Sequence, residues 1–126
     1  MSMRAISILS EDGRLLADRA WAATAWTERA RGWVGKPSVE AGEGLLLNPA
    51  SSIHSFGMRF SFDLAFLDSR GRVLKLRPAM RPGRVAMAPL GAWMKDRGIQ
   101  ALELPPGSLA SWGLRVGQGL SFPDRA

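Results

Sequence analysis

The chain has one histidine, His54, and it lies in the stretch from Gly42 to Asp68 that also holds four of the five phenylalanines. An imidazole titrates near neutral pH, so it can bind ligands, hold a metal or carry protons. A buried imidazole bonded to a backbone carbonyl is an equally good interpretation of a histidine among apolar residues. His54 is the first candidate site residue, with a structural role left open.

Polar groups that could share a site with His54 follow in the same stretch. Gly57 predicts a bend that folds the His54 segment back against the polar half of the next strand. Polar clusters on an otherwise apolar sheet are places where binding sites tend to form. We therefore expect a small polar cleft, with candidate ligand-binding residues His54, Met58, Arg59, Asp63 and Glu43.

Several kinds of chemistry lack the residues that they need. Ser52 and His54 lie two residues apart on one strand face, roughly 6–7 Å apart, which is too far for a nucleophile and its base. One histidine and no cysteine argue against a zinc site, and no acidic cluster indicates magnesium or calcium. We expect no metal and no other cofactor, and we assign no catalytic residue. An enzyme that uses His54 as a proton carrier stays an alternative.

Three acidic residues, Glu43, Asp63 and Glu103, lie among apolar neighbours. A half-buried carboxylate must be paired or hydrogen-bonded, because its charge is otherwise costly. The structural interpretation, in which these acids bind backbone N–H groups or arginines, is favoured. The alternative is the polar floor of a pocket with perturbed titration.

Basic residues outnumber acidic ones by 17 to 11, giving a net charge of +6. The tract from Arg70 to Lys95 contains no acidic residue. It could bind anions weakly, and the candidate residues are Arg70, Arg72, Lys75 and Arg77. Only Trp93 could stack on a base there, so we expect no specific nucleic-acid binding. A solvated basic edge that discourages strand pairing is favoured.

The elements that must position these residues are mostly short strands. Alternation and turn signals predict strands over 4–9, 14–21, 45–47, 51–56, 58–67, 71–76, 98–104 and 120–122, with a further short strand at 85–88 inside an irregular 77–91 segment. The longest strand, 58–67, carries phenylalanines on its even positions and should be buried on both faces at one end. Helical spacing predicts a helix over 25–31 and a single turn over 108–112.

Tryptophans 26 and 33 recur on one face of the first predicted helix, which favours a core anchor over a ligand platform. Together the elements predict a mainly β fold: a compact jelly-roll-like or barrel-like antiparallel domain with one or two short helices, spanning 1–126 as a single domain. No apolar run approaches the roughly 20 residues of a membrane span. We expect a soluble cytoplasmic protein that does not bind membranes.

Five segments come in a familiar order and spacing: Arg29-Ala-Arg-Gly-Trp, Gly42-Glu-Gly-Leu-Leu-Leu, Ser52-Ile-His-Ser-Phe-Gly-Met-Arg-Phe, Asp63-Leu-Ala-Phe-Leu-Asp and Leu102-Glu-Leu-Pro-Pro-Gly. With these segments the chain resembles the bacterial and archaeal family called domain of unknown function 192, from about Leu15 to Phe122. The resemblance implies a compact, mainly β fold of jelly-roll-like type and brings no reaction with it. The chain departs from the family pattern at Ala50, Ser61 and Gln118, where relatives tend to have cysteine, proline and aspartate.

The functional expectation is a β domain that binds a small or peptidic ligand in a polar cleft around His54. The alternatives are an enzyme of unknown reaction and a weak anion-binding or nucleic-acid-binding protein. The loss of the thiol and of the carboxylate at Ala50 and Gln118 lowers the expectation of catalysis. We expect a monomer or a weak homodimer.

Overall fold

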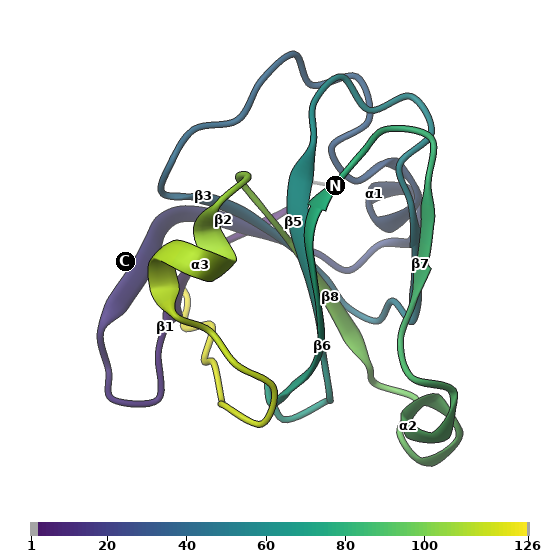
Figure 1. Ribbon diagram of the computed structural model, residues 1–126. Coiled ribbons are helices and arrows are strands. Elements are labelled where there is room, and N and C mark those ends of the chain that lie inside the picture. Colours follow the sequence, from purple (N-terminus) through teal and green to yellow (C-terminus); the bar gives the residue numbers. More distant parts are fainter. Residues whose placement is uncertain (1–2, 126) are drawn as a thin grey trace.

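The structure is a computed structural model that describes residues 3–125. Strands dominate it, and three short helices connect or cover them (Figure 1). In chain order the elements are β1 (Arg4–Leu9), β2 (Leu15–Ala23), α1 (Trp26–Arg31), β3 (Glu43–Leu47), β4 (Ser52–His54), β5 (Phe62–Leu67), β6 (Val73–Met80), β7 (Val85–Met87), α2 (Leu90–Lys95), β8 (Gln100–Leu104) and α3 (Ser108–Trp112).

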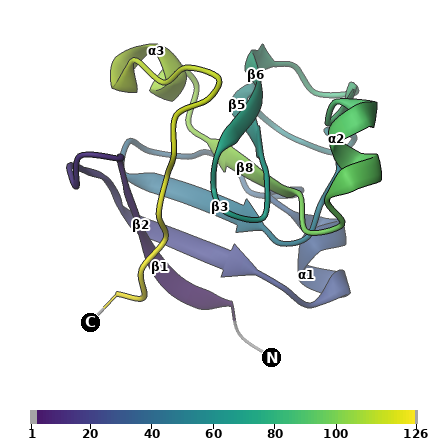
Figure 2. The same cartoon turned by 90° about the horizontal axis from the view of Figure 1, so that it is seen from below.

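Six of the strands form one sheet in the order β1-β2-β3-β8-β5-β6, and β4 pairs with β7 in a separate two-stranded sheet. In Figures 1 and 2, α3 and the C-terminal segment lie on one face of the large sheet and α1 on the other. The β4–β7 pair packs on the α1 side, where Ile53 and Ala86 share a core with Trp33. The large sheet is therefore covered on both faces.

Strand β5 shows how this two-sided burial arises, because all six of its residues are buried. Its even positions, such as Phe62 and Phe66, pack in the core on the α1 side. Its odd positions Ala65 and Leu67 pack in the second core with Leu109 of α3. Side chains alternate between faces along a strand, so one apolar run supplies both cores.

The mainly β class is confirmed, while some of its details are wrong. The large sheet does not close into a barrel, and it is mixed, because β2 and β3 pair in parallel. Crossing from β2 to β3 through α1 places the two strands in the same direction, as crossover connections do. Helix α2 occupies part of the predicted irregular segment, so the described residues hold three helices, and β6 extends to Met80.

The predicted strand over 58–67 begins only at Phe62. Residues 55–58 form a turn instead, in which Met58 N–H donates to Ser55 O at 3.1 Å and Gly57 has φ +83°. Ser55 is fully buried, and its hydroxyl donates to Arg81 O at 2.6 Å. These bonds hold the turn against the β6–β7 connection, so the apolar alternation of Met58 and Phe60 occurs outside a strand.

The two tryptophans expected on one buried helix face differ in their burial. Trp33 is buried, 8% exposed, and its ring lies 5.9 Å from that of Phe60, whereas Trp26 is 71% exposed. Helix α1 ends at Arg31 and Gly32 adopts φ +51°, which turns the chain before Trp33. The helix is thus too short to place both tryptophans on one buried face.

Candidate functional site

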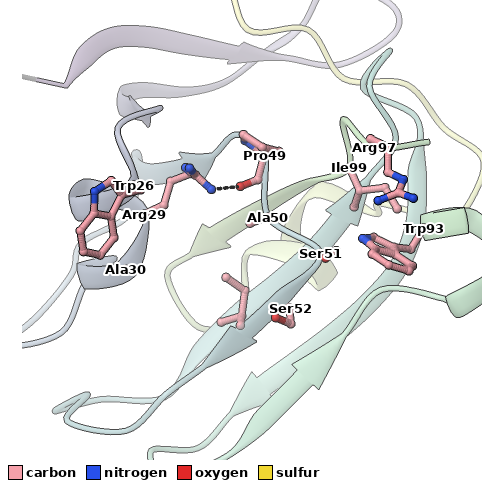
Figure 3. A pocket seen from close by; sticks show the side chains of 11 residues that line it. Trp26, Arg29, Ala30, Pro49, Ala50, Ser51, Ser52, Trp93, Arg97 and Ile99 are labelled. Atoms are coloured by element: carbon pink, nitrogen blue, oxygen red, sulfur yellow. Dashed lines mark hydrogen bonds between the residues drawn. The ribbon is translucent and has the colours of Figure 1, made fainter.

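A groove of about 590 Å³ runs between α1 and the chain segment that enters β4. Figure 3 shows Trp26 and Arg29 on its α1 side, the 49–52 segment along its floor, and Trp93 and Arg97 at the far side. The Arg29 guanidinium donates to Pro49 O at 2.8 Å and to Thr24 O at 3.1 Å. The bond to Pro49 fixes α1 to the segment that enters β4, and so sets how far apart the two walls of the groove lie.

The groove continues into a smaller cavity of about 120 Å³ under the turn that follows α1. The two spaces share four wall residues, Arg29, Ala30, Ser52 and Ile53. The smaller cavity adds the 31–34 turn, His54, Met58 and Glu103. A space of this size accommodates a few water molecules, each of which takes about 30 Å³, or one small polar group.

Glu103 is the most unusual group in this cavity. Its side chain extends from β8 toward the α1 side of the sheet, it is 3% exposed, and its Oε1 has no hydrogen-bond partner among the described residues. Burial raises the pKa of Glu103 to about 8, and the backbone N–H of Trp33 only partly opposes this. At neutral pH the carboxyl is therefore mostly protonated and can donate a hydrogen bond.

Gly32 lets the turn approach this carboxyl closely. A Cβ at Gly32 would lie 3.2 Å from Oε1 of Glu103, and the residue has φ +51°. Both the close approach and the backbone conformation favour glycine, which has no Cβ. The Gly32–Trp33 turn therefore closes one side of the cavity above the acid.

His54 lies at the exposed end of the same cavity. Its ring stacks on Phe56 with 5.6 Å between centroids, and its Nδ1 accepts the Phe56 N–H at 3.2 Å. This bond assigns the proton of the neutral imidazole to Nε2, which can then donate to a ligand. Met58, 7% exposed, lines the cavity beside it.

The other three predicted ligand-binding residues lie elsewhere. Asp63 is on the opposite face of the sheet, where its two oxygens accept the Ala79 and Leu109 N–H groups at 2.9 Å each. Arg59 is exposed and lines neither the groove nor the smaller cavity. The bend at Gly57 therefore does not bring His54 to the cluster that we expected with Arg59 and Asp63, because the chain turns away before β5 begins.

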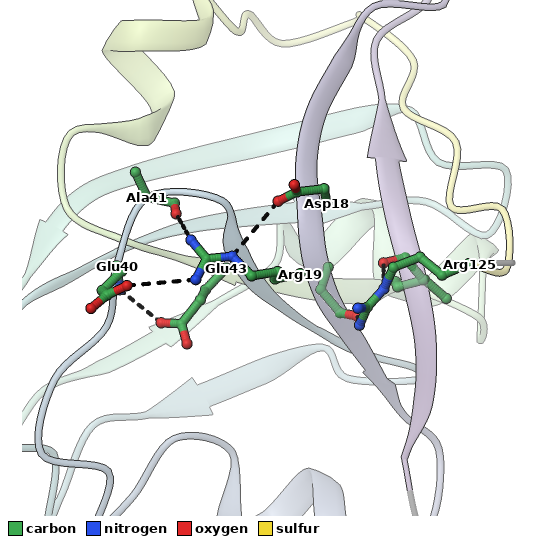
Figure 4. Close-up of polar contacts among 8 residues, drawn as sticks. Asp18, Arg19, Glu40, Ala41, Glu43 and Arg125 are labelled. Carbon is green, nitrogen blue, oxygen red and sulfur yellow. Dashed lines mark hydrogen bonds and ion pairs between the residues drawn. The ribbon is translucent and has the colours of Figure 1, made fainter.

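Glu43 borders a separate concavity of about 720 Å³ on the other side of the 31–36 turn. Around its rim, acids and bases pair with one another, as Figure 4 shows for Arg19 with Asp18 and Glu40. Glu43 itself bonds the Glu40 N–H at 2.7 Å and lies 3.5 Å from Lys36 Nζ. Arg19, Lys36 and Glu43 there have charged partners. Glu28 Oε2 has no partner among the described residues, but Glu28 Oε1 accepts the Ala25 N–H at the start of α1, which gives this acid a structural role and makes the concavity the weaker candidate.

The predicted anion-binding residues lie along β6 and the turn before it. β6 is an edge strand of the large sheet, which agrees with a basic edge that opposes strand pairing. Two of the cations are committed to backbone carbonyls: Arg72 bonds Gly117 O at 2.6 Å, and Lys75 bonds Met87 O at 2.9 Å. Arg70 and Arg77 are left to face anions, so the tract has no dedicated anion pocket.

Residues 3–125 contain no group of three or more histidine, cysteine or acidic side chains placed to hold a metal ion. Within the same range, no helix is long and apolar enough to cross a membrane.

Sequence reasoning weighed Glu103 as a pocket-floor acid but did not select it, and it missed Trp26, Arg29, Trp93 and Arg97. A glutamate inside an apolar run, Leu102 to Leu104, was the available signal for the first. No pattern connected the others, because α1 and α2 are far apart in sequence and meet only across the groove.

Residues 7–122 match the model of the domain of unknown function 192 family, described as an uncharacterised ACR. The chain belongs to this family. No curated protein matches the sequence. The resemblance inferred from the five sequence segments is thus confirmed.

Two solved structures share the fold. One is a proposed transcription regulator from Sinorhizobium meliloti 1021, with TM-score 0.74 and 16% identity over 96% of this chain and 94% of that one. The other is a protein of unknown function from Novosphingobium aromaticivorans DSM 12444, with TM-score 0.75 and 18% identity over 94% of this chain and 84% of that one. At these identities the likeness concerns the fold alone.

Proposed function

We propose that this member of the domain of unknown function 192 family is a binding domain that takes a small or peptidic ligand in the groove between α1 and β4. The Glu103 carboxyl donates a hydrogen bond to the ligand at the closed end, and His54 contacts it at the mouth. The observation that carries this proposal is the unpartnered Oε1 of a carboxyl that is 3% exposed and lines a cavity.

An unpartnered buried polar group is costly in a folded protein. Nearly all buried polar groups in proteins have a hydrogen-bond partner, and leaving one without a partner costs about 1–3 kcal/mol. A leucine at this position would avoid the cost and still fill the core between Leu45 and Leu64 on the neighbouring strands. A ligand atom that accepts from Glu103 would remove the cost, so an acid here is consistent with binding.

The surroundings indicate the chemistry of the ligand. Arg29 and Arg31 line the cavity, and no carboxylate lies within 4.0 Å of either in the described part of the chain. Positive charge beside a protonated acid disfavours a cationic ligand and favours one that carries acceptor oxygens. A carboxylate or an amide carbonyl meets both requirements.

The test is an amide NMR titration of ¹⁵N-labelled protein with acetate, N-acetylglycine and N-acetylalanine amide. We expect shifts at Gly32, Trp33 and His54 that persist in Glu103→Gln, whose amide also donates, and disappear in Glu103→Leu. Glu103→Leu leaves the Trp33 N–H without its acceptor, so its fold is first checked from its amide spectrum, and Glu103→Gln is the variant that keeps an acceptor there.

The matched control is Glu40→Leu, which removes an exposed carboxylate outside the groove. It should leave the shifts unchanged. Shifts at the groove that survive in Glu103→Leu, or the absence of shifts there with every probe, would mean that the cavity holds only water and that the proposal is wrong.

A second candidate function, acid–base catalysis, has one specific observation in its favour. The pKa of Glu103, raised to about 8, suits a general acid near neutral pH, and Glu103 lines the same cavity as His54. Hydrolysis of p-nitrophenyl acetate that is lost in both Glu103→Leu and His54→Ala would favour catalysis. A rate equal to that of Glu40→Leu in both variants would exclude it for this substrate.

A further inference from the structure

The backbone of β4 has one paired edge and one open edge. On the paired side, Ala88 N–H donates to Ser51 O, and Ser55 N–H donates to Arg84 O, both at 2.8 Å. In an antiparallel pair, alternate residues point their N–H and C=O groups toward the partner strand. Because residues 51 and 55 face β7, the backbone groups of Ser52 and His54 point the other way, and no described residue bonds them.

This open edge lies along the groove. The groove and the smaller cavity are both lined by β4 residues together with residues of α1, and β7 residues line neither. The groove volume of about 590 Å³ falls within the roughly 300–1,000 Å³ that ligand pockets occupy. The space therefore begins where the hydrogen bonds of β4 are missing.

The two outer edges of the large sheet are protected, and in β7 Lys75 Nζ donates to Met87 O at 2.9 Å. The C-terminal segment covers β1, with bridges from Ile6 to Asp124 and from Leu9 to Ser121, and the basic residues described above lie along β6. The β4 strand, Ser-Ile-His, contains no lysine, arginine or proline. Edge strands without such protection are templates for pairing with another chain.

The charges of the groove specify the kind of chain that would pair. Within the described residues, neither Arg29 nor Arg97 has a carboxylate within 4.0 Å, and the Arg97 guanidinium is held 4.8 Å from the centre of the Trp93 ring. Both arginines flank the segment that enters β4, beyond Ser52. Arg29 already donates to Pro49 O and Thr24 O through Nη1 and Nε, so an acidic group placed there would pair mainly with Arg97 and reach Arg29 only through Nη2.

We propose that the open edge of β4 receives an extended acidic peptide as a third strand of the β4–β7 sheet. This inference rests on the proposed function, that the groove binds a ligand, and it names the ligand class. The peptide backbone pairs with Ser52 and His54, an acidic group at one end lies between Arg29 and Arg97, and an inward-pointing side chain enters the cavity at Glu103.

Strand addition of this kind derives its affinity from backbone hydrogen bonds and its specificity from pockets for alternate side chains. Three residues of β4 span about 10 Å at roughly 3.3 Å per residue, so a peptide of about five residues reaches from the cavity to the arginines. The probes are capped pentapeptides of alternating valine and threonine with one terminal aspartate, prepared in both sequence directions.

The experiment measures Kd by calorimetry for each peptide and for single N-methylated versions at every position. N-methylation removes a donor, so we expect a loss of about tenfold or more at alternate positions and little change between them. Replacing aspartate by asparagine should weaken binding to the wild-type protein but not to Arg97→Gln. The matched control is Arg115→Gln, an exposed arginine outside the groove, which should keep the aspartate preference.

The outcomes separate this inference from the proposed function. If peptides bind but N-methylation has the same effect at every position, or none, strand addition is wrong and a groove ligand remains. Strand addition is also wrong, and a groove ligand remains, if acetate or N-acetylglycine binds at Glu103 while no pentapeptide does. Binding of adenosine monophosphate in the groove without binding of the peptides leads to the same conclusion. If no probe binds the groove, both proposals fail.

Discussion

The buried acid Glu103 should make the stability of this protein depend on pH in an unusual direction. Its pKa is raised from 4.5 to about 8 by burial, so folding opposes its ionisation. For a group with a raised pKa, ionisation favours the unfolded chain, which binds fewer protons than the native state across this range. The loss of stability caused by Glu103 is therefore absent below about pH 4.5, and it grows as the pH rises to about 8.

The magnitude follows from the same values. One pKa unit is worth about 1.4 kcal/mol, so a pKa raised from 4.5 to about 8 corresponds to roughly 5 kcal/mol of lost stability above pH 8. This figure is an upper value, because water that enters the neighbouring cavity lowers the cost of the charge. Asp12 and Asp96 have lowered pKa values and act only at acidic pH.

The assay is urea unfolding of the wild type and of Glu103→Gln at intervals from about pH 5 to pH 9. The amide cannot ionise, so the free energy of unfolding of Glu103→Gln should exceed that of the wild type by an amount that grows with pH. His54, Arg29 and Arg31 line the same cavity as Glu103. The comparison of Glu and Gln at position 103 is therefore repeated in a His54→Gln background, so that any contribution of the histidine to the pH dependence is removed. A difference that stays constant from pH 5 to pH 9 would refute the reasoning.

Further predictions concern the core, an exposed ring, a buried acid and the basic tract. Phe62→Ala should cost about 3–5 kcal/mol in urea unfolding, because its fully buried ring would leave a cavity, and a loss below about 1 kcal/mol would contradict this. Trp26→Ala, at a side chain 71% exposed, should change stability by less than about 0.5 kcal/mol, and a larger loss would mean that it packs in the core. Asp63→Ala should cost about 2–4 kcal/mol, because the buried Leu109 N–H and the part-buried Ala79 N–H lose their acceptor, and a neutral change would show that water replaces it. Any DNA binding by the tract at Arg70 to Lys95 should fall steeply with added salt, and a complex that survives high salt would contradict the absence of a dedicated anion site.

The fold and the candidate site differ in how far the sequence predicts them. The phenylalanine alternation at Phe62 and Phe66 predicts buried positions, because strand periodicity is a local property. The turn at Gly57 and the end of β3 before Pro49 are predictable for the same reason. The start of β5 is not, since Met58 and Phe60 keep the apolar alternation while hydrogen bonds from Ser55 to a distant connection hold them in a turn.

The sequence by itself determined the family, the mainly β class and most of the strands, because motif order, apolar alternation and turn residues are all written along the chain. It also singled out His54 and Met58, which line one cavity. Only the tertiary structure decided that Glu103 joins them and that Asp63 does not, since adjacent strands set which face each acid occupies. Tertiary packing likewise brought Arg29 of α1 and Arg97, just beyond α2, to opposite sides of one groove, and it left the β4 edge open along that groove. Contacts between residues so far apart in sequence depend on how strands pair, and no local pattern encodes that pairing.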